Sequence, residues 1–270
     1  MKLRALAVAL GLAASLAAGA ARATNVSTDV TDVWWPDAEP GWGIQLIQNA
    51  DLIFATMFIY DIDNQPMFVV AVLEKQPGAD VWSGGVFGSE GTSYDLPWDP
   101  ADRFEAQVGT MSFTLANAAS GTLVYTIGTF STAKPISRQA LKPENNTGSY
   151  RITHTWTATG AGCTAADAYS PAAGPVSGDL SIVNVNSEVA TVELTWQHVP
   201  SDICSMTASY AQAGRLGTYG GTLSCPSGKS GDLVFYEVAN AVGTLTGRYV
   251  MNWTYGCTRT GRFTAISPNP

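Results

Sequence analysis

Hydrophobic residues in this chain occur in short runs that alternate with polar residues, and no window keeps a 3.6-residue apolar period. The runs recur at intervals of about 8–12 residues and are bounded by Gly, Asn, Asp and Pro, a pattern typical of antiparallel sandwiches and barrels. The chain is therefore predicted to be all-β. In the first half we expect a meander or partial barrel with strands at Gly43–Gln48, Leu52–Tyr60, Met67–Leu73, Val81–Phe87, Val108–Leu115, Thr122–Ile127 and Phe130–Ile136.

The second half carries eight further runs joined mostly by short turns. Eight consecutive antiparallel strands are enough to close an up-and-down barrel, which removes the exposed sheet edges. We therefore predict an eight-stranded, barrel-like second domain. Its strands are expected at Ser149–Thr157, Gly178–Val183, Val189–Gln197, Ser205–Tyr210, Gly217–Ser224, Asp232–Val238, Thr244–Asn252 and Thr258–Ile266.

A shift in composition divides the chain into two domains. Residues 24–141 hold 14 acidic residues against 4 basic ones and no Cys, whereas residues 142–270 hold 8 acidic residues, 7 basic ones and all four Cys. We predict an N-terminal domain at 24–141, a linker at 142–148 and a C-terminal domain at 149–270. One connector, Ser89–Ala106, is long for a compact domain, and such loops are often functional.

The first 23 residues have the three parts of a secretory signal peptide. Lys2 and Arg4 precede the apolar run Ala5–Ala18, and Ala21-Arg22-Ala23 forms an A-x-A cleavage site. The apolar run is shorter than the about 20 residues that a membrane anchor needs. We expect cleavage near Ala23 and a periplasmic or secreted protein with no transmembrane span in the mature chain.

The charge balance excludes nucleic acid as a partner. The formal charge is −8, and the leader holds three of the 14 basic residues, so the mature chain has 11 bases against 22 acids. Nucleic-acid binding proteins need clustered Lys and Arg to displace counterions from phosphates. Here the basic residues are scattered along the sequence and outnumbered two to one.

The four cysteines predict two disulfides, which suits an oxidising compartment. In an up-and-down barrel Cys163, Cys204, Cys225 and Cys257 all lie at one end. The turn at Gly214-Arg215 is equidistant from Cys204 and Cys225, so we favour that pair, and barrel closure then pairs Cys163 with Cys257. The rival connectivity Cys163–Cys204 with Cys225–Cys257 uses the same end, and the sequence leaves the choice open.

Several short motifs are spread over about residues 34–141. The first is Trp34-x-Pro36-x-x-Glu39-x-Gly41-Trp42-Gly43, the W-x-P-x-x-E-x-G-W-G type. The others are Phe54-Ala-Thr-x-Phe58-x-Tyr60-Asp61, Trp98-Asp99-Pro100, Val108-Gly109-Thr110-x-x-Phe113, Gly121-Thr-Leu-x-Tyr125 and Lys134-Pro-Ile-x-Arg138-Gln139. In this order and spacing they resemble a family of uncharacterised exported proteobacterial β-rich domains. The turn after Asp61 departs from the family in having Asn64 where Gly is usual, and Phe68 follows the turn proline closely. The resemblance implies a β-rich exported module and no settled activity.

A shorter stretch in the second half, Gly243-Thr-Leu-Thr-Gly-Arg-Tyr249, is similar to a hairpin and strand of avidin-type, calycin-like barrels. The resemblance implies barrel geometry, with Tyr249 as the one position that carries over as a ligand-facing hydroxyl. The Trp-rich ligand lid of that family has no counterpart here.

Enzymatic chemistry finds little support in the sequence. Nucleophilic triads need a histidine base, and the chain has only His154, predicted to be a strand or core residue, and His198, predicted to lie in a loop. Their isolation gives no metal-binding spacing, and the turn after Tyr60 lacks the Gly and Glu of a calcium loop. We expect no catalytic residue, metal or cofactor. A hydrolase would need two carboxylates in one cleft, for which the candidates are Glu193, Glu237, Asp37 and Glu39.

Aromatic residues are enriched in the first domain, beside many carboxylates. Rigid aromatic faces with nearby acids suit sugars or cationic ligands. Trp34, Trp35 and Trp98 lie near prolines in predicted loops, so we take them as candidate ligand-contacting residues, with simple packing as the alternative. The remaining aromatics considered are expected to fill the core: Trp42, Phe54, Phe58 and Phe113.

Three hypotheses follow. The first is an exported, non-catalytic binding protein for a small molecule or glycan, with its site at the N-terminal aromatic cluster or at the mouth of the C-terminal barrel. The second is a structural or protein-interaction module of the cell envelope. The third is an extracellular hydrolase that uses paired carboxylates.

Overall fold

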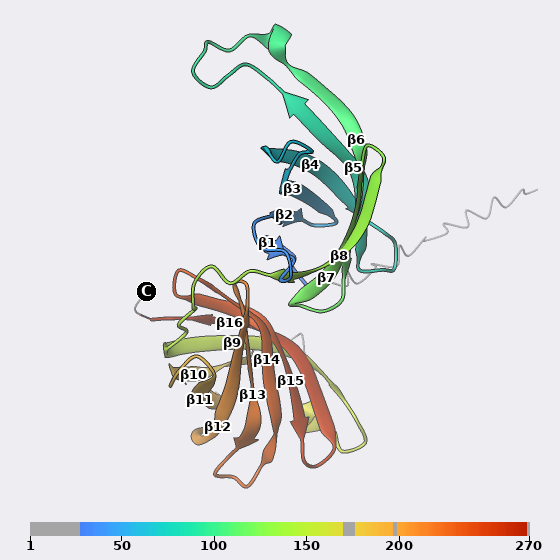
Figure 1. The fold of residues 1–270 in the computed structure, drawn as a ribbon. Coiled ribbons are helices and arrows are strands. Elements are labelled where there is room, and N and C mark those ends of the chain that lie inside the picture. Colours follow the sequence, from blue (N-terminus) through green and yellow to red (C-terminus); the bar gives the residue numbers. More distant parts are fainter. Residues whose placement is uncertain (1–27, 170–175, 197–198, 269–270) are drawn as a thin grey trace, which may run out of the picture.

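The computed structural model describes residues 28–169, 176–196 and 199–268. They form two closed antiparallel barrels of eight strands each, an N-terminal barrel of β1–β8 and a C-terminal barrel of β9–β16 (Figure 1). The expected leader and His198 lie outside the described residues. Within those residues, no helix has the length and apolar character needed to cross a bilayer.

The N-terminal barrel follows the chain, since each strand pairs with the next one and β1 pairs with β8. Its strands are β1 (Asp32–Trp35), β2 (Gly43–Asn49), β3 (Leu52–Tyr60), β4 (Pro66–Lys75), β5 (Val81–Glu90), β6 (Phe104–Leu115), β7 (Ser120–Ile127) and β8 (Phe130–Arg138). A single-turn 3₁₀ helix, η1 (Pro100–Asp102), precedes β6.

The expected partial barrel is in fact closed, because the chain contains a strand that the hydrophobic pattern does not reveal. Trp34 and Trp35 belong to β1 and do not lie in a loop; Trp34 pairs with Arg138 and Trp35 with Ser137 of β8. A strand of four residues shows too few alternations to be recognised by its period. Proline at position 36 then ends the strand, since proline has no N–H to donate to a sheet.

The C-terminal barrel is also a meander, and it closes through the pairing of β9 with β16. Its strands are β9 (Gly148–Thr159), β10 (Val176–Asn184), β11 (Val189–Trp196), β12 (Val199–Ala213), β13 (Leu216–Ser224), β14 (Ser230–Ala241), β15 (Thr244–Trp253) and β16 (Cys257–Ile266), with the 3₁₀ helix η2 (Ala165–Asp167) after β9.

Both disulfides have the pairing favoured from the sequence. Cys204 is bonded to Cys225 between the neighbouring strands β12 and β13. Cys163, which follows β9, is bonded to Cys257 at the start of β16. Both bridges lie at the same end of the C-terminal barrel, because alternate strand directions bring these four positions together.

Side chains alternate between the interior and the surface, and this corrects two of the expected core positions. In β3 the interior holds Ile53, Ala55 and Met57, while Phe54 and Phe58 lie on the outer face, 45% and 53% exposed. Both faces of this strand are apolar, so alternation alone could not identify the buried one. Phe113 is fully buried as expected, and Trp42 is partly buried against the core.

A buried arginine joins the first and last strands of the N-terminal barrel. The guanidinium of Arg138 lies over the ring of Trp34, 4.6 Å from its centroid, and donates to the carboxylate of Asp32. Three further hydrogen bonds from the guanidinium reach backbone carbonyls next to strands β1 and β7, those of Asp29, Thr31 and Ala118. Burial lowers the pKa of Arg138, and the hydrogen bond and charge of Asp32 oppose this shift. The buried charge therefore depends on its partners.

The same acid connects the two barrels. Asp32 also accepts a hydrogen bond from the backbone N–H of Arg215, in the turn between β12 and β13, and the Arg215 side chain pairs with Asp29. The segment between the barrels is anchored by Asn146, which is buried, donates to the Tyr219 hydroxyl at 2.9 Å and accepts from Asn240. The expected linker therefore closes one end of the C-terminal barrel with satisfied polar contacts.

We expect Trp34→Ala to lower the free energy of unfolding by about 3–5 kcal/mol, because it opens a cavity in the core and removes the ring over Arg138. Urea denaturation followed by far-ultraviolet circular dichroism measures the loss. The control is Trp98→Ala, whose side chain is exposed and whose replacement should change stability by no more than about 0.5 kcal/mol. Equal effects for the two variants would contradict the placement of Trp34.

The two disulfides should contribute unequally to stability. The Cys163–Cys257 bridge spans 94 residues and the Cys204–Cys225 bridge only 21. A cross-link that closes a longer loop removes more entropy from the unfolded chain, so replacing the first pair by Ser should cost about 4–5 kcal/mol and the second about 3 kcal/mol. Urea midpoints of the two double variants test this order, which a larger loss for the short loop would reverse.

Candidate functional site: the mouth of the N-terminal barrel

One open end of the N-terminal barrel, here called the distal mouth, lies at the end opposite the contacts with the C-terminal barrel. It is formed where β1, β3, β5 and β7 end and where β2, β4, β6 and β8 begin. Four side chains, here called the mouth cluster, meet at this end although they come from segments far apart in the chain: Glu39, Trp42, Tyr125 and Lys134.

The centre of the mouth cluster is an ion pair between Glu39 and Lys134, 2.5 Å apart and 95 residues apart in sequence. The second oxygen of the Glu39 carboxylate accepts a hydrogen bond from Nε1 of Trp42 at 3.1 Å. The hydrogen bonds from Lys134 and then Trp42 lower the pKa of Glu39 below its ordinary value, and the bond to Glu39 raises the pKa of Lys134. Both groups are therefore charged at neutral pH.

Tyr125 connects this polar group to the interior of the barrel. Its ring packs edge-on against Trp42, with centroids 6.2 Å apart, and against Phe130 at the start of β8. Burial raises the pKa of the Tyr125 phenol, so the hydroxyl stays protonated. The mouth thus presents one indole, one phenol and one ion pair within a small region.

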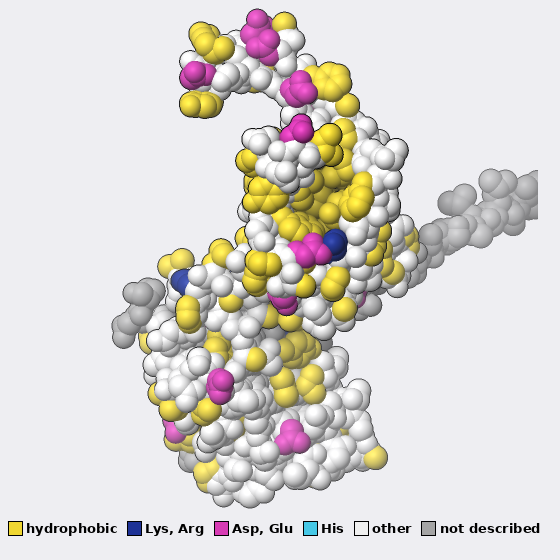
Figure 2. Space-filling view, viewed as in Figure 1, with side chains coloured by type: hydrophobic (Ala, Val, Ile, Leu, Met, Phe, Trp, Pro, Cys, Tyr) yellow, Lys and Arg dark blue, Asp and Glu magenta, His cyan; other side chains and the backbone are white. Residues whose placement is uncertain are grey.

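Beneath this polar group the barrel interior is apolar and incompletely covered. The inward-facing residues at this end are only partly buried although they pack against the core: Ile59, Met67, Val108 and Ile127. Figure 2 shows hydrophobic side chains exposed in a hollow of the N-terminal barrel, with acidic and basic side chains at its edge. An apolar concave surface with a few polar groups is the usual composition of a small-ligand site.

An extended hairpin rises from the same end of the barrel. Residues 91–103, here called the arm, connect β5 to β6 and project beyond the other strands (Figure 1). The Thr92 hydroxyl donates to the backbone carbonyl of Asp99 and accepts from its backbone N–H, and the Asp99 side chain caps η1. Figure 2 shows hydrophobic and acidic side chains gathered on the arm. Trp98 packs over Gly91, yet two thirds of its surface is exposed.

The three tryptophans predicted to contact a ligand do not form one cluster. Trp34 is fully buried in the core, and its Nε1 donates to the Val30 carbonyl. Trp35 is partly buried at the end of β1, at the distal mouth. Trp98 is on the arm. The predicted loop placement was therefore wrong for Trp34 and Trp35, and of the three side chains only Trp98 is largely exposed.

Sequence reasoning did not identify Lys134 as a functional residue or pair it with Glu39. A signal was present, since Lys134 is one of only four basic residues in 24–141, and Glu39, Trp42, Tyr125 and Lys134 all belong to the motifs quoted above. Their convergence at the distal mouth gives these separate motifs one physical location. Arg138 and Phe113, from the same motifs, serve instead in the core.

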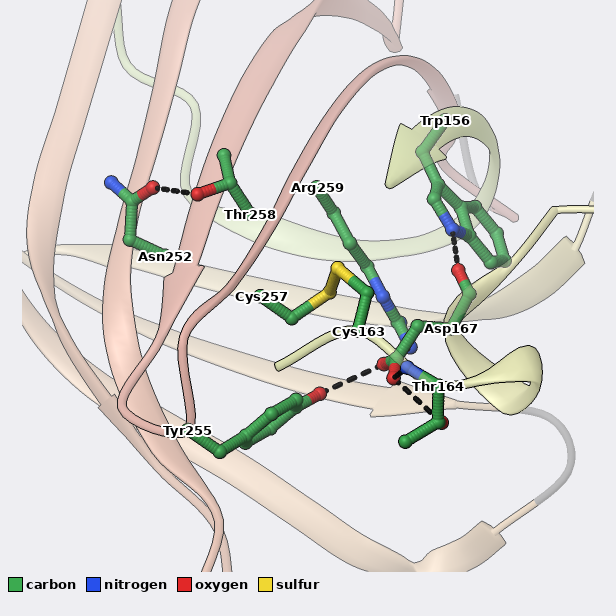
Figure 3. Close-up of a disulfide and its surroundings, with 9 residues drawn as sticks. All are labelled: Trp156, Cys163, Thr164, Asp167, Asn252, Tyr255, Cys257, Thr258 and Arg259. Atoms are coloured by element: carbon green, nitrogen blue, oxygen red, sulfur yellow. Dashed lines mark hydrogen bonds and ion pairs between the residues drawn. A yellow bond between two sulfur atoms is a disulfide. The ribbon is translucent and has the colours of Figure 1, made fainter. Parts of the chain in front are cut away.

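The disulfide end of the C-terminal barrel, the other site considered, is covered by the strap of residues 160–169. Asp167 in the strap accepts hydrogen bonds from Thr164, Tyr255 and Arg259 (Figure 3). Burial alone raises the pKa of Asp167, but these bonds outweigh it and hold the pKa far below 3.8. Trp156 donates to the Asp167 carbonyl. These contacts, together with the Cys163–Cys257 bridge, fasten the strap over this end.

Inside this barrel His154 is buried, which confirms the expected core role. Its Nδ1 is 2.8 Å from the hydroxyl of Tyr249, and its ring stacks on Trp156. Burial raises the pKa of Tyr249. The Tyr249 hydroxyl therefore faces the interior, where it is hydrogen bonded to His154.

The four candidate carboxylates for hydrolysis do not form a pair with one another; each has its own surroundings. Glu193 is exposed on β11, while Glu237 on β14 pairs with Arg248. Asp37 accepts from the hydroxyl of Ser137, and Glu39 is paired with Lys134. Among the described residues, no group of three or more His, Cys, Asp and Glu side chains is arranged to hold a metal ion.

Comparison of the chain with models of known protein families gives no match, and comparison with curated protein sequences gives none either.

The Glu39 pair predicts a pH dependence at the mouth. Because the folded pKa of Glu39 is lowered from 4.5, the contact with Trp42 should be intact above pH 4.5 and be lost only as the pH falls through the lower folded value. An NMR titration of the Trp42 indole N–H resonance tests this, with Trp82 as the internal control and Glu39→Gln expected to abolish the transition. A midpoint at or above 4.5 would contradict the pairing.

Proposed function

We propose that this protein is an exported, non-catalytic binding protein whose ligand, a small molecule or glycan, is held at the distal mouth of the N-terminal barrel. The observation that carries the proposal is the convergence of Glu39, Trp42, Tyr125 and Lys134 above an exposed apolar hollow. A core that only needed stability would bury these hydrophobic side chains and would not require an ion pair beside them.

The chemistry of the mouth suits a ligand with an apolar face and several polar groups. The indole of Trp42 and the ring of Tyr125 offer flat apolar surface, as the C–H face of a sugar requires. The Glu39 and Lys134 side chains offer an acceptor and a donor at the edge of that surface. Trp98 on the arm provides a second aromatic face, and its neighbours Asp95 and Asp99 favour cationic groups.

The alternative, an interaction module of the cell envelope, is favoured by a different surface. The outer face of β2–β4 carries neighbouring apolar side chains that are about half exposed: Ile47, Phe54, Phe58, Phe68 and Val72. Cross-strand pairing places Phe54 between Ile47 and Val72, and Phe58 beside Phe68. Contiguous apolar patches of this kind often mark protein contacts.

We expect native mass spectrometry of the mature protein, incubated with envelope extract, to show a retained small molecule. Titration with maltotriose, cellotriose and choline, followed by tryptophan fluorescence, then distinguishes neutral glycans from a cationic ligand. Trp98→Ala and Lys134→Met should each weaken binding by about tenfold or more, since interface aromatics and paired charges carry most of the binding energy.

Phe54→Ala is the matched control, because it removes an exposed aromatic ring from the outer face of the same barrel. Unchanged affinity in Trp98→Ala and Lys134→Met would refute a site at the distal mouth. A discrete homo-oligomer without bound ligand that Phe54→Ala dissociates would support the interaction module, and breakdown of an oligosaccharide would support hydrolysis.

A further inference from the structure

A groove lies where the C-terminal barrel meets the segment that leads into β1. Its volume is about 530 Å³, within the range of about 300–1,000 Å³ typical of small-molecule sites. This junction groove crosses the outer surface of β9, β16, β15 and β14 and ends against Asp29 and Arg215. It is separate from the distal mouth.

Strand register arranges the floor of the junction groove in two rows. In one row, Thr153 pairs with Thr264, which pairs with Thr246. In the parallel row, Thr155 pairs with Arg262, which pairs with Arg248. Two arginines therefore stand directly opposite each other on neighbouring strands, beside a row of hydroxyls.

Like charges opposite each other in a sheet are destabilising, and only one of these two has an acidic partner. Arg248 is paired with Glu237 at 3.0 Å, at a bulge of β14 where Glu237 has a φ of +54°. Among the 11 described Lys and Arg residues, nine form ion pairs; the exceptions are Arg262 and Lys229, which lies in the turn between β13 and β14.

The other charged groups of the groove already have hydrogen-bond or ion-pair partners. Glu237 also accepts from the Thr28 hydroxyl, and Asp29 is paired with Arg215. Three arginines against two acids leave one positive charge in excess within the groove. The chain holds 22 acidic residues against 14 basic ones, yet the exposed Arg262 lies opposite a second arginine and not opposite an acid.

We propose that the junction groove is a second binding site, for a small organic anion whose phosphate or carboxylate group lies on Arg262 and Arg248. The planar guanidinium matches both anions through two parallel hydrogen bonds. The volume exceeds the need of a bare ion, so the threonine row is available to hydroxyl groups on the body of the ligand. Because Asp29 and Arg215 line the same groove, a bound anion contacts both sides of the junction between the barrels.

Isothermal titration calorimetry of the mature chain tests the site with four probes: glucose 6-phosphate, glucuronate, inorganic phosphate and glucose. We expect the two sugar anions to bind, inorganic phosphate to bind more weakly and glucose not to bind. The affinity should fall as NaCl is added, because exposed charges are screened. Arg262→Gln should weaken binding of the sugar anions by about tenfold or more without lowering the melting temperature.

Lys229→Gln is the matched control, since it removes the other unpaired positive charge and leaves the groove intact. Trp98→Ala should leave anion binding unchanged, which separates this site from the distal mouth. Absence of binding by both sugar anions at millimolar concentration, equal losses in Arg262→Gln and Lys229→Gln, or equal binding of glucose would each overturn the proposal.

Discussion

The buried contact between Asp32 and Arg138 is the constraint on which much of this architecture depends. It ties β1 to β8, and those two strands share only two paired positions. A buried guanidinium is costly unless its N–H groups have acceptors. Here Asp32 and the backbone carbonyls of the segments next to β1 and β7 accept four hydrogen bonds from it. Closure of the N-terminal barrel thus depends on polar satisfaction as well as on apolar packing.

Asp32 also fixes how the two barrels contact each other. Asp32 accepts from Arg138 within its own barrel and from the backbone of Arg215 in the other. Gly214 beside it has a positive φ, and a Cβ there would lie 2.2 Å from the Asp32 carboxylate. Only glycine permits this approach without displacement. The turn that separates Cys204 from Cys225 therefore also forms the contact with the N-terminal barrel.

The outer end of the C-terminal barrel is covered, whereas that of the N-terminal barrel is open. In the C-terminal barrel the strap, fastened by Asp167 and by the Cys163–Cys257 bridge, covers the disulfide end. The N-terminal barrel has no cysteine, and its distal mouth leaves Ile59 and Met67 partly exposed beneath the Glu39–Lys134 pair. The distal mouth is therefore the open end at which a ligand could bind. The arginine pair of the junction groove marks the second proposed binding site.

Local patterns in the sequence predicted every strand except β1, because alternation and turn residues act over a few positions. They also favoured the observed disulfide pairing, because a meander brings its cysteines to one end, but they left the rival pairing open. Local patterns did not identify which face of β3 is buried. Both of its faces are apolar, and barrel closure decides that Ala55 faces inward and Phe58 outward. Closure also brings Glu39 to Lys134 across 95 residues. The register of the hairpin formed by β15 and β16 places Arg248 opposite Arg262. Such contacts depend on register between strands, which composition and spacing do not encode.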